Sequence, residues 1–323
     1  MSTLLQSVDK FVENISVTDR QEANIESSYN NLKDNLLIED SNLSVKEVFL
    51  NGSYERDTII RPLDDIDLFA VIDEADYSEN GQDPKPQTVL TGFKNYLNSL
   101  NDYKDKVKQD RPCVTVFLSD KKFDVLPSLR KAGALWIPNF DLSSWTFTDP
   151  KTHTDRLNEI HKRRNCKVKP VVKAVKHWKR ENNQNIPSFH VEEVAISVFN
   201  IWNFSNLEEG IRFWFEHAEG YLQVDRFNSY DEYSKVKDKI KTVKDKLGEA
   251  QKSNDEKQVG EAKKIGKEIF GKEFPALDAD EAKGFSSSLK EGALKYGAAT
   301  GLSATVGSAM AASKGYYGDI YSA

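Results

Sequence analysis

The amino-acid sequence predicts an α/β (α+β) fold, in which a domain built on a mixed sheet precedes a helical second domain. Two observations support this prediction, and a third indicates a separate tail. Residues 1–150 combine amphipathic helical segments with short apolar stretches of strand length. From residue 151 to residue 275, the apolar residues recur mostly with helical spacing. Residues 276–323 are rich in Gly, Ala and Ser and poor in large aliphatic residues, which predicts a flexible C-terminal tail.

The first predicted domain begins with helices and continues with strands. Residues 3–37 place apolar side chains at helical spacing, so we expect amphipathic helices that face a core. The further elements follow from apolar runs and the polar turns between them. They are a strand over Val45–Leu50, a polar helical turn over Tyr54–Thr58, a buried strand over Ile66–Ile72, a helix over residues 86–100, and strands over Val114–Leu118 and Phe123–Leu126.

The second predicted domain consists of helices. Val171–Arg180 and Val191–Trp202 both have a helical period. The latter has a start signal in Ser188, followed by two glutamates in the first turn. Residues 234–270 are rich in Lys and Glu, with regularly spaced apolar residues, which predicts long exposed helices.

The composition argues against several classes of protein. Proteins that bind long duplex nucleic acid are usually basic overall, whereas this chain has a net charge of -6. Any such role must therefore rest on a local basic patch. Cys113 and Cys166 alone cannot build a disulfide scaffold, which favours a reducing compartment. The N-terminal segment lacks the apolar core of a signal peptide, and no apolar run is long enough to cross a bilayer. We therefore expect a cytoplasmic protein with no membrane partner.

Three aspartates on two predicted strands form the most informative pattern. Asp65 and Asp67 share one face of a strand, because they lie two residues apart, and their apolar neighbours point into the core. Asp124 is also flanked by apolar residues, on a strand that could lie beside the first. Such carboxylates repel one another unless divalent cations neutralise them, and two Mg²⁺ ions suit phosphoryl-transfer chemistry. Asp64, by contrast, is expected to be a cap or turn residue.

Two further groups of residues point to a phosphate ligand. Gly52 lets a phosphate approach the backbone after a strand, and the Ser53 hydroxyl and neighbouring N–H groups can donate hydrogen bonds to it. Nine basic residues and no acidic residue lie between Lys162 and Arg180. This run predicts an anion site that fits a triphosphate, although many such charges are simply solvated. Lys176, on an otherwise packed helix, is the one most expected to face a ligand.

Several segments together resemble one protein family. They are GSYERDTIIRPLDDIDLF, KFDVLP, VVKAVKHWKR, PSFHVEEVAISVF and IFGKEFP. These segments resemble the bacterial cGAS/DncV-like nucleotidyltransferases (CD-NTases) and, more distantly, animal cGAS and the 2′-5′ oligoadenylate synthetases. The resemblance spans residues 1–275. It implies a polymerase-β-like nucleotidyltransferase domain over residues 1–150, completed at the nucleotide cleft by the helical domain over residues 151–275.

The same resemblance implies roles for the aspartates and the Gly-Ser pair. Asp65, Asp67 and Asp124 would bind the metal, with Asp124 also helping to activate the acceptor hydroxyl. Gly52 and Ser53 would hold the donor triphosphate.

Three residues of the helical domain also match family positions. Lys176 would contact the terminal phosphates of the donor, and Ser188 would add a hydroxyl to the same triphosphate. Phe189 falls where the family often places an aromatic that stacks on a base. Two alternatives stay open at this point: Ser188 as a helix cap, and Phe189 as a core aromatic.

The resemblance further implies an activity, with cofactors and partners. We expect an Mg²⁺-dependent enzyme, with Mn²⁺ as a substitute, that condenses NTPs into a cyclic di- or trinucleotide second messenger in antiphage (CBASS-type) signalling. Nucleic acid is not required for this activity. The alternatives are synthesis of linear oligonucleotides, nucleotidyl transfer to RNA or another acceptor, and a nucleotide-binding regulator without turnover. Operon-encoded regulatory or conjugating proteins that act on the C-terminal tail are the expected partners.

Overall fold

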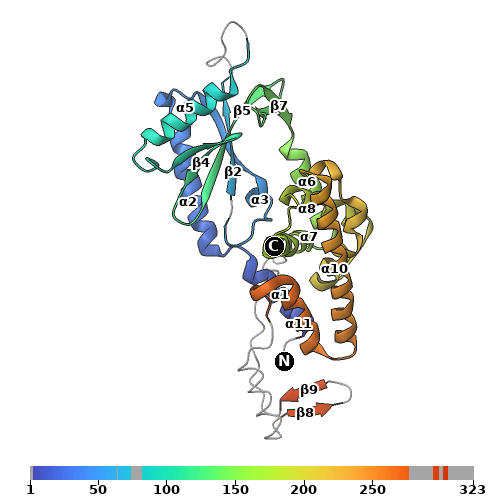
Figure 1. Ribbon diagram of the computed structural model, residues 1–323. Helices are drawn as coiled ribbons and strands as arrows, with labels where there is room; N and C mark the ends of the chain where they lie inside the picture. Colours follow the sequence, from blue (N-terminus) through green and yellow to red (C-terminus); the bar gives the residue numbers. More distant parts are fainter. Residues whose placement is uncertain (1–2, 64, 74–81, 276–293, 298–300, 305–323) are drawn as a thin grey trace. The chain divides into compact units, whose positions relative to one another are not determined.

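A computed structural model describes residues 3–63, 65–73, 82–275, 294–297 and 301–304 (Figure 1). The predicted turn at Asp64 and most of the predicted tail lie outside these ranges. The helices are α1 (Leu4–Ile15), α2 (Asp19–Leu36), α3 (Gly52–Glu55), α5 (Pro86–Ser99), α6 (Pro150–Arg163), α7 (Val168–Glu181), α8 (Ser188–Ile201), α9 (Leu207–His217), α10 (Tyr230–Asp255) and α11 (Val259–Phe270). The strands are β1 (Val45–Asn51), β2 (Asp65–Ile72), β3 (Val107–Asp110), β4 (Cys113–Phe117), β5 (Lys122–Lys131), β6 (Ala134–Pro138), β7 (Trp145–Thr148), β8 (Leu294–Gly297) and β9 (Gly301–Ala304).

Strands β1 to β7 form one mixed sheet, which confirms the predicted fold class. The strand order is β1-β2-β5-β4-β3, and β6 pairs with both β5 and β7. The central pair, β2 and β5, is parallel, whereas β1 pairs antiparallel with β2 and β4 pairs antiparallel with β5. The two strands predicted to carry the aspartates therefore lie side by side at the centre of the sheet.

One face of the sheet is covered by helices and the other carries the acidic residues. Ile66 and Leu68 of β2 are fully buried, in a core shared with residues of α2 and α5. Phe123 and Val125 of β5 belong to the same core. Because side chains alternate along a strand, the aspartates between these apolar residues project from the opposite face.

The helical half has a core of its own, which also includes the N-terminal helix. Phe11 of α1 packs against Phe270 and Phe274, with ring centroids 4.8 and 5.5 Å apart. The predicted first domain includes residues 1–15, but the apolar face of α1 is buried in the core of the helical half. The sheet-bearing segment thus leaves the helical half after α1 and returns to it at α6 (Figure 1).

Residues Thr3–Ala276 form one compact unit. Beyond it, the described part of the predicted tail consists of β8 and β9, which pair antiparallel with Leu294 opposite Ala304. No helix in the described ranges combines the length and the apolar character that crossing a lipid bilayer requires.

Candidate active site

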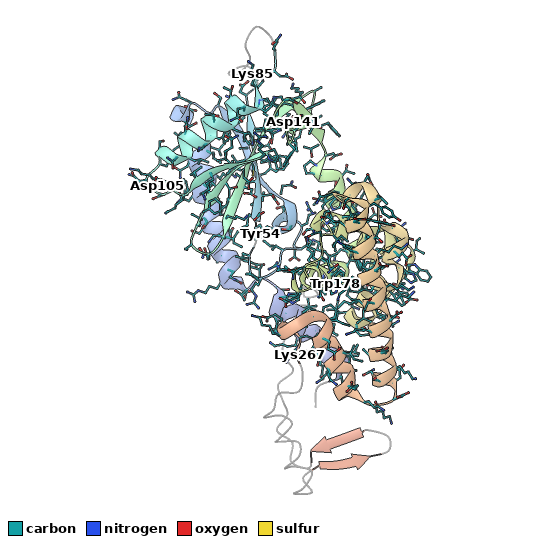
Figure 2. The ribbon with its side chains drawn as sticks, in the orientation of Figure 1. Tyr54, Lys85, Asp105, Asp141, Trp178 and Lys267 are labelled. Atoms are coloured by element: carbon teal, nitrogen blue, oxygen red, sulfur yellow. The ribbon has the colours of Figure 1, made fainter. Side chains whose placement is uncertain are left out.

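A cavity of about 680 Å³ lies between the acidic face of the sheet and helices α7 and α8. That volume falls in the range of ordinary small-molecule sites. Figure 2 labels Tyr54 on α3 and Trp178 on α7, the two helices that contribute Ser53 and Lys176 to the cavity wall. Six residues that the sequence singled out line the cavity: Ser53, Asp65, Asp67, Lys176, Ser188 and Phe189.

The strand register places the three predicted aspartates together. Asp67 of β2 is paired directly with Asp124 of β5, and Asp65 is paired with Lys122. Adjacent strands lie about 4.8 Å apart, so Asp67 and Asp124 are immediate neighbours on one face. Asp65 lies two residues before Asp67, on that same face.

The charges of these carboxylates are poorly compensated in the metal-free protein. Burial, together with the charges of Asp124 and Asp65, raises the pKa of Asp67 to about 6. Burial also raises the pKa of Asp124, although a hydrogen bond from the Thr115 hydroxyl at 2.6 Å opposes the shift. The Nζ atom of Lys122 lies 2.6 Å from Oδ1 of Asp65 and is that carboxylate's counter-ion.

The carboxylates suit a divalent cation in charge and donor chemistry. Mg²⁺ prefers carboxylate oxygens, and a cation would relieve the repulsion that raises the pKa of Asp67. They are not preassembled around a common point, however. In the part of the chain that the structure describes, no three His, Cys, Asp or Glu side chains form a ready ligand group. The cation would have to compete with Lys122 for Asp65 and with Thr115 for Asp124.

Gly52 fits its position because no other residue has room there. Its φ is +70°, and an added Cβ atom would lie 1.7 Å from Oδ2 of Asp67. The next residue, Ser53, is fixed through its carbonyl oxygen, which accepts hydrogen bonds from the N–H groups of Thr58 and Ile59 at 2.8 and 3.0 Å. These hydrogen bonds fix the Gly-Ser turn, and Gly52 lies directly against Asp67 of β2.

Lys176 lines the cavity, but its ammonium group already has partners. Its Nζ atom lies 2.6 Å from Oε1 of Glu192 and 2.8 Å from the Thr58 hydroxyl. Burial lowers the pKa of Lys176, and the charge of Glu192 opposes that shift. The structure therefore places Lys176 at the cavity, as predicted. It also pairs Lys176 with Glu192, which in the sequence indicates only the first turn of a helix.

Ser188 and Phe189 both lie at the cavity. The helix cap considered for Ser188 is absent, since α8 begins at this residue and its N-cap position is Pro187. The Ser188 hydroxyl instead lies 3.0 Å from Nζ of Lys179. Phe189 is 41% exposed, so it is not a core aromatic. Its ring lies 4.1 Å from that of His153, centroid to centroid.

The basic run between Lys162 and Arg180 does not face a single site. Arg164 donates a hydrogen bond to the carbonyl of Phe199 near the end of α8, and Lys173 pairs with Asp57. Only the end of the run, which comprises Lys176, Lys179 and Arg180, lines the cavity. The run extends from the end of α6 through the connecting residues into α7, so most of its members lie away from the cavity lining.

Comparison with known proteins places the first half of the chain in a described family. Residues 1–160 match the Second Messenger Oligonucleotide or Dinucleotide Synthetase (SMODS) domain. A cyclic AMP-AMP-AMP synthase from an Acinetobacter species is 30% identical over 195 residues, which are 57% of this chain and 54% of that protein. The chain therefore spans about half the length of this curated relative.

Solved structures share the fold over most of both chains. The Escherichia coli MS115-1 protein CdnC, solved in complex with a HORMA protein, superposes with a TM-score of 0.67 at 18% identity. The superposition covers 84% of this chain and 98% of that one. The Bradyrhizobium diazoefficiens CD-NTase CdnG, solved with GTP, gives a TM-score of 0.65 at 14% identity, over 87% and 98% of the two chains.

Proposed function

We propose that this chain, which belongs to the bacterial cGAS/DncV-like nucleotidyltransferase (CD-NTase) family, condenses NTPs into a cyclic di- or trinucleotide. The observation that carries the proposal is the pairing of Asp124 with Asp67, which lines a cavity together with Ser53 and Lys176. This arrangement brings together carboxylates for metal binding and donors for a triphosphate.

The chain's own residues divide the work between the two sides of the cavity. Asp65, Asp67 and Asp124 would hold Mg²⁺, which when bound supplies charge neutralisation for the phosphates. The carboxylate of Asp124 would accept the proton of an acceptor hydroxyl. The Ser53 hydroxyl would donate to the donor triphosphate beside Gly52.

The helical side would complete the donor site. Lys176 and the Ser188 hydroxyl would contact the phosphates, and Phe189 offers an exposed ring on which a base can stack. Cations at this wall are suited to the charge of a triphosphate.

The relatives support proposals for the substrate and for a partner protein. ATP is the first substrate to test, because a relative is named a cyclic AMP-AMP-AMP synthase. A HORMA protein accompanies CdnC in its structure, so we propose that a regulatory protein also binds this chain, in an antiphage (CBASS-type) system. Conjugation of the tail at GYYGDIYSA belongs to the same proposal, although those residues lie outside the described ranges.

The test is incubation of the protein with all four NTPs and Mg²⁺ or Mn²⁺, followed by phosphatase treatment and mass spectrometry. Phosphatase-resistant oligonucleotides that are absent with a D65N/D67N variant are the expected result. Phosphatase-sensitive products would instead indicate a linear oligonucleotide synthase. If product forms only when RNA is added, and RNA becomes labelled, the enzyme transfers nucleotides to RNA. NTP binding without any product, even with operon partners added, would favour a regulator without turnover.

A further inference from the structure

Glu192 is the most completely surrounded charged group at the cavity. Its side chain is 0% exposed, although Glu192 of α8 is itself among the residues that border the cavity. It has four polar partners within 3 Å: Arg56 at 2.7 Å, Thr58 at 2.6 Å, Lys176 at 2.6 Å and His153 at 2.9 Å. A buried carboxylate is tolerated only with such partners.

The partners come from both halves of the molecule. Arg56 and Thr58 follow α3 on the sheet side, whereas His153 and Lys176 lie on α6 and α7. Thr58 also extends the network to the Gly-Ser turn, because its backbone N–H donates to the carbonyl oxygen of Ser53 at 2.8 Å. A single carboxylate thus connects the Gly-Ser turn to the helices across the cavity.

Stability alone does not account for this network. Buried ion pairs contribute little net stability compared with apolar residues of similar size. The two cations that contact Glu192, Arg56 and Lys176, also line the cavity, and their side chains are nearly buried, at 8% and 5% exposed. Without a fixed anion, such cations would turn toward solvent or, in the case of lysine, lose the proton.

We propose that Glu192 is a positioning residue that holds Arg56 and Lys176 at the cavity wall and connects them, through Thr58, to the Gly-Ser turn. This inference rests on the proposed function, because it assigns these cations to the NTP triphosphate. Glu192 itself touches no substrate in this scheme. It acts by holding both cations in place and by keeping the Lys176 ammonium charged.

The charges around Lys176 give the inference a pH signature. The pKa of Lys176 is lowered by burial and raised by Glu192, with weaker effects from Arg56, which lowers it, and Asp67, which raises it. His153 of α6 contacts Glu192 from the other side. Loss of the Glu192 charge therefore lowers the pKa of Lys176 further, so the neutral amine forms at lower pH. Nucleotide affinity of such a variant should fall as pH rises.

The experiment compares E192Q with E193Q in the full chain. Glu193 is a matched control on the same helical turn, where it pairs with Arg226 and His190 at 2.7 and 2.8 Å, away from the cavity lining. The probes are the α,β-methylene analogues of the four NTPs with Mg²⁺, and binding is measured by calorimetry between pH 6.5 and 9. Melting temperatures are recorded in parallel.

We expect E192Q to weaken analogue binding about tenfold or more at neutral pH, because charge-assisted contacts to the triphosphate are lost. The loss should deepen with rising pH, whereas E193Q should bind like the wild type. Adding K176R to E192Q should restore part of the affinity at high pH, because guanidinium stays charged. Wild-type affinity for E192Q across this pH range, even with a lowered melting temperature, would overturn the inference.

A second variant keeps the test decisive if E192Q does not fold. T58V preserves side-chain shape and removes the hydroxyl between Glu192 and Lys176, so it should also weaken analogue binding, and unchanged binding would count against the network. The proposed function is tested separately by product formation. A wild-type protein that binds the analogues but converts no NTP contradicts that function alone. A wild-type protein that binds none of them contradicts both.

Discussion

At the scale of single residues, Asp67 has a charge that its surroundings disfavour. Its folded-state pKa of about 6 exceeds the model-peptide value of 3.8, so ionising it in the metal-free protein costs stability. The cost is absent below about pH 4 and complete above about pH 6. This difference in the pKa of Asp67 lowers the free energy of unfolding above about pH 6 by an amount on the order of 3 kcal/mol.

Asp67→Asn should therefore abolish turnover and stabilise the metal-free fold. We expect a higher free energy of unfolding in EDTA at pH 7.5 and little difference at pH 4, measured by urea denaturation. Asp73→Asn, just after the same strand, removes a carboxylate that is paired with Lys46 and serves as the control. A destabilised D67N protein at pH 7.5 would contradict the electrostatic argument.

Magnesium should act on the same repulsion in the wild-type protein. Millimolar Mg²⁺ at pH 7.5 should raise the melting temperature of the wild type, because a ligand that binds only the folded state stabilises it. The D65N/D67N variant should show no such rise. An equal rise in both proteins would place the metal effect elsewhere.

Sequence patterns identified the aspartates but missed Glu192, for a physical reason. The two-residue period of a strand and its apolar neighbours locate Asp65 and Asp67 from local information alone. The environment of Glu192 depends instead on Arg56 and Thr58, which are 136 and 134 residues away in the chain. In sequence, a glutamate near a helix start is explained equally well by the helix dipole.

At the scale of elements, the turn between β1 and α3 should tolerate no side chain. Gly52→Ala places a methyl group within 1.7 Å of Asp67 and should lower turnover at least about 100-fold by displacing the loop. Gly133→Ala is the matched control, since its φ is +82° but no atom lies within 4 Å of an added Cβ. It should cost only about 1–2 kcal/mol in stability and leave turnover intact. Equal losses in both variants would show that backbone strain, not the clash, is responsible.

The elements predicted best are those with long periodic patterns. The apolar strand over Ile66–Ile72 corresponds to β2, and the helical period over Val171–Arg180 corresponds to α7. The prediction omitted β3, β6 and β7, which have four, five and four residues. In β6 and β7, buried and exposed side chains do not alternate clearly, and β7 carries the exposed Phe147. Short strands at the edge of a sheet depend on pairing more than on sequence pattern.

At the scale of the whole molecule, residues Thr3–Ala276 should suffice for folding and chemistry. All residues of the candidate site lie in this compact unit. A chain that ends at Ala276 should melt at the wild-type temperature and yield the same nucleotide product. Thermal denaturation and product analysis against the full chain would check this. A lower melting temperature or an altered product would give the tail a role in the site.

The docking of α1 in the helical core has a consequence for how the molecule comes apart. Two covalent connections join the sheet to the helices, one after Ile15 and one before Pro150. A protease that cuts once near Asp149 would break only the second. Because Phe11 and its neighbours on α1 would stay packed against Phe270 and Phe274, the two fragments should migrate together until a denaturant separates them.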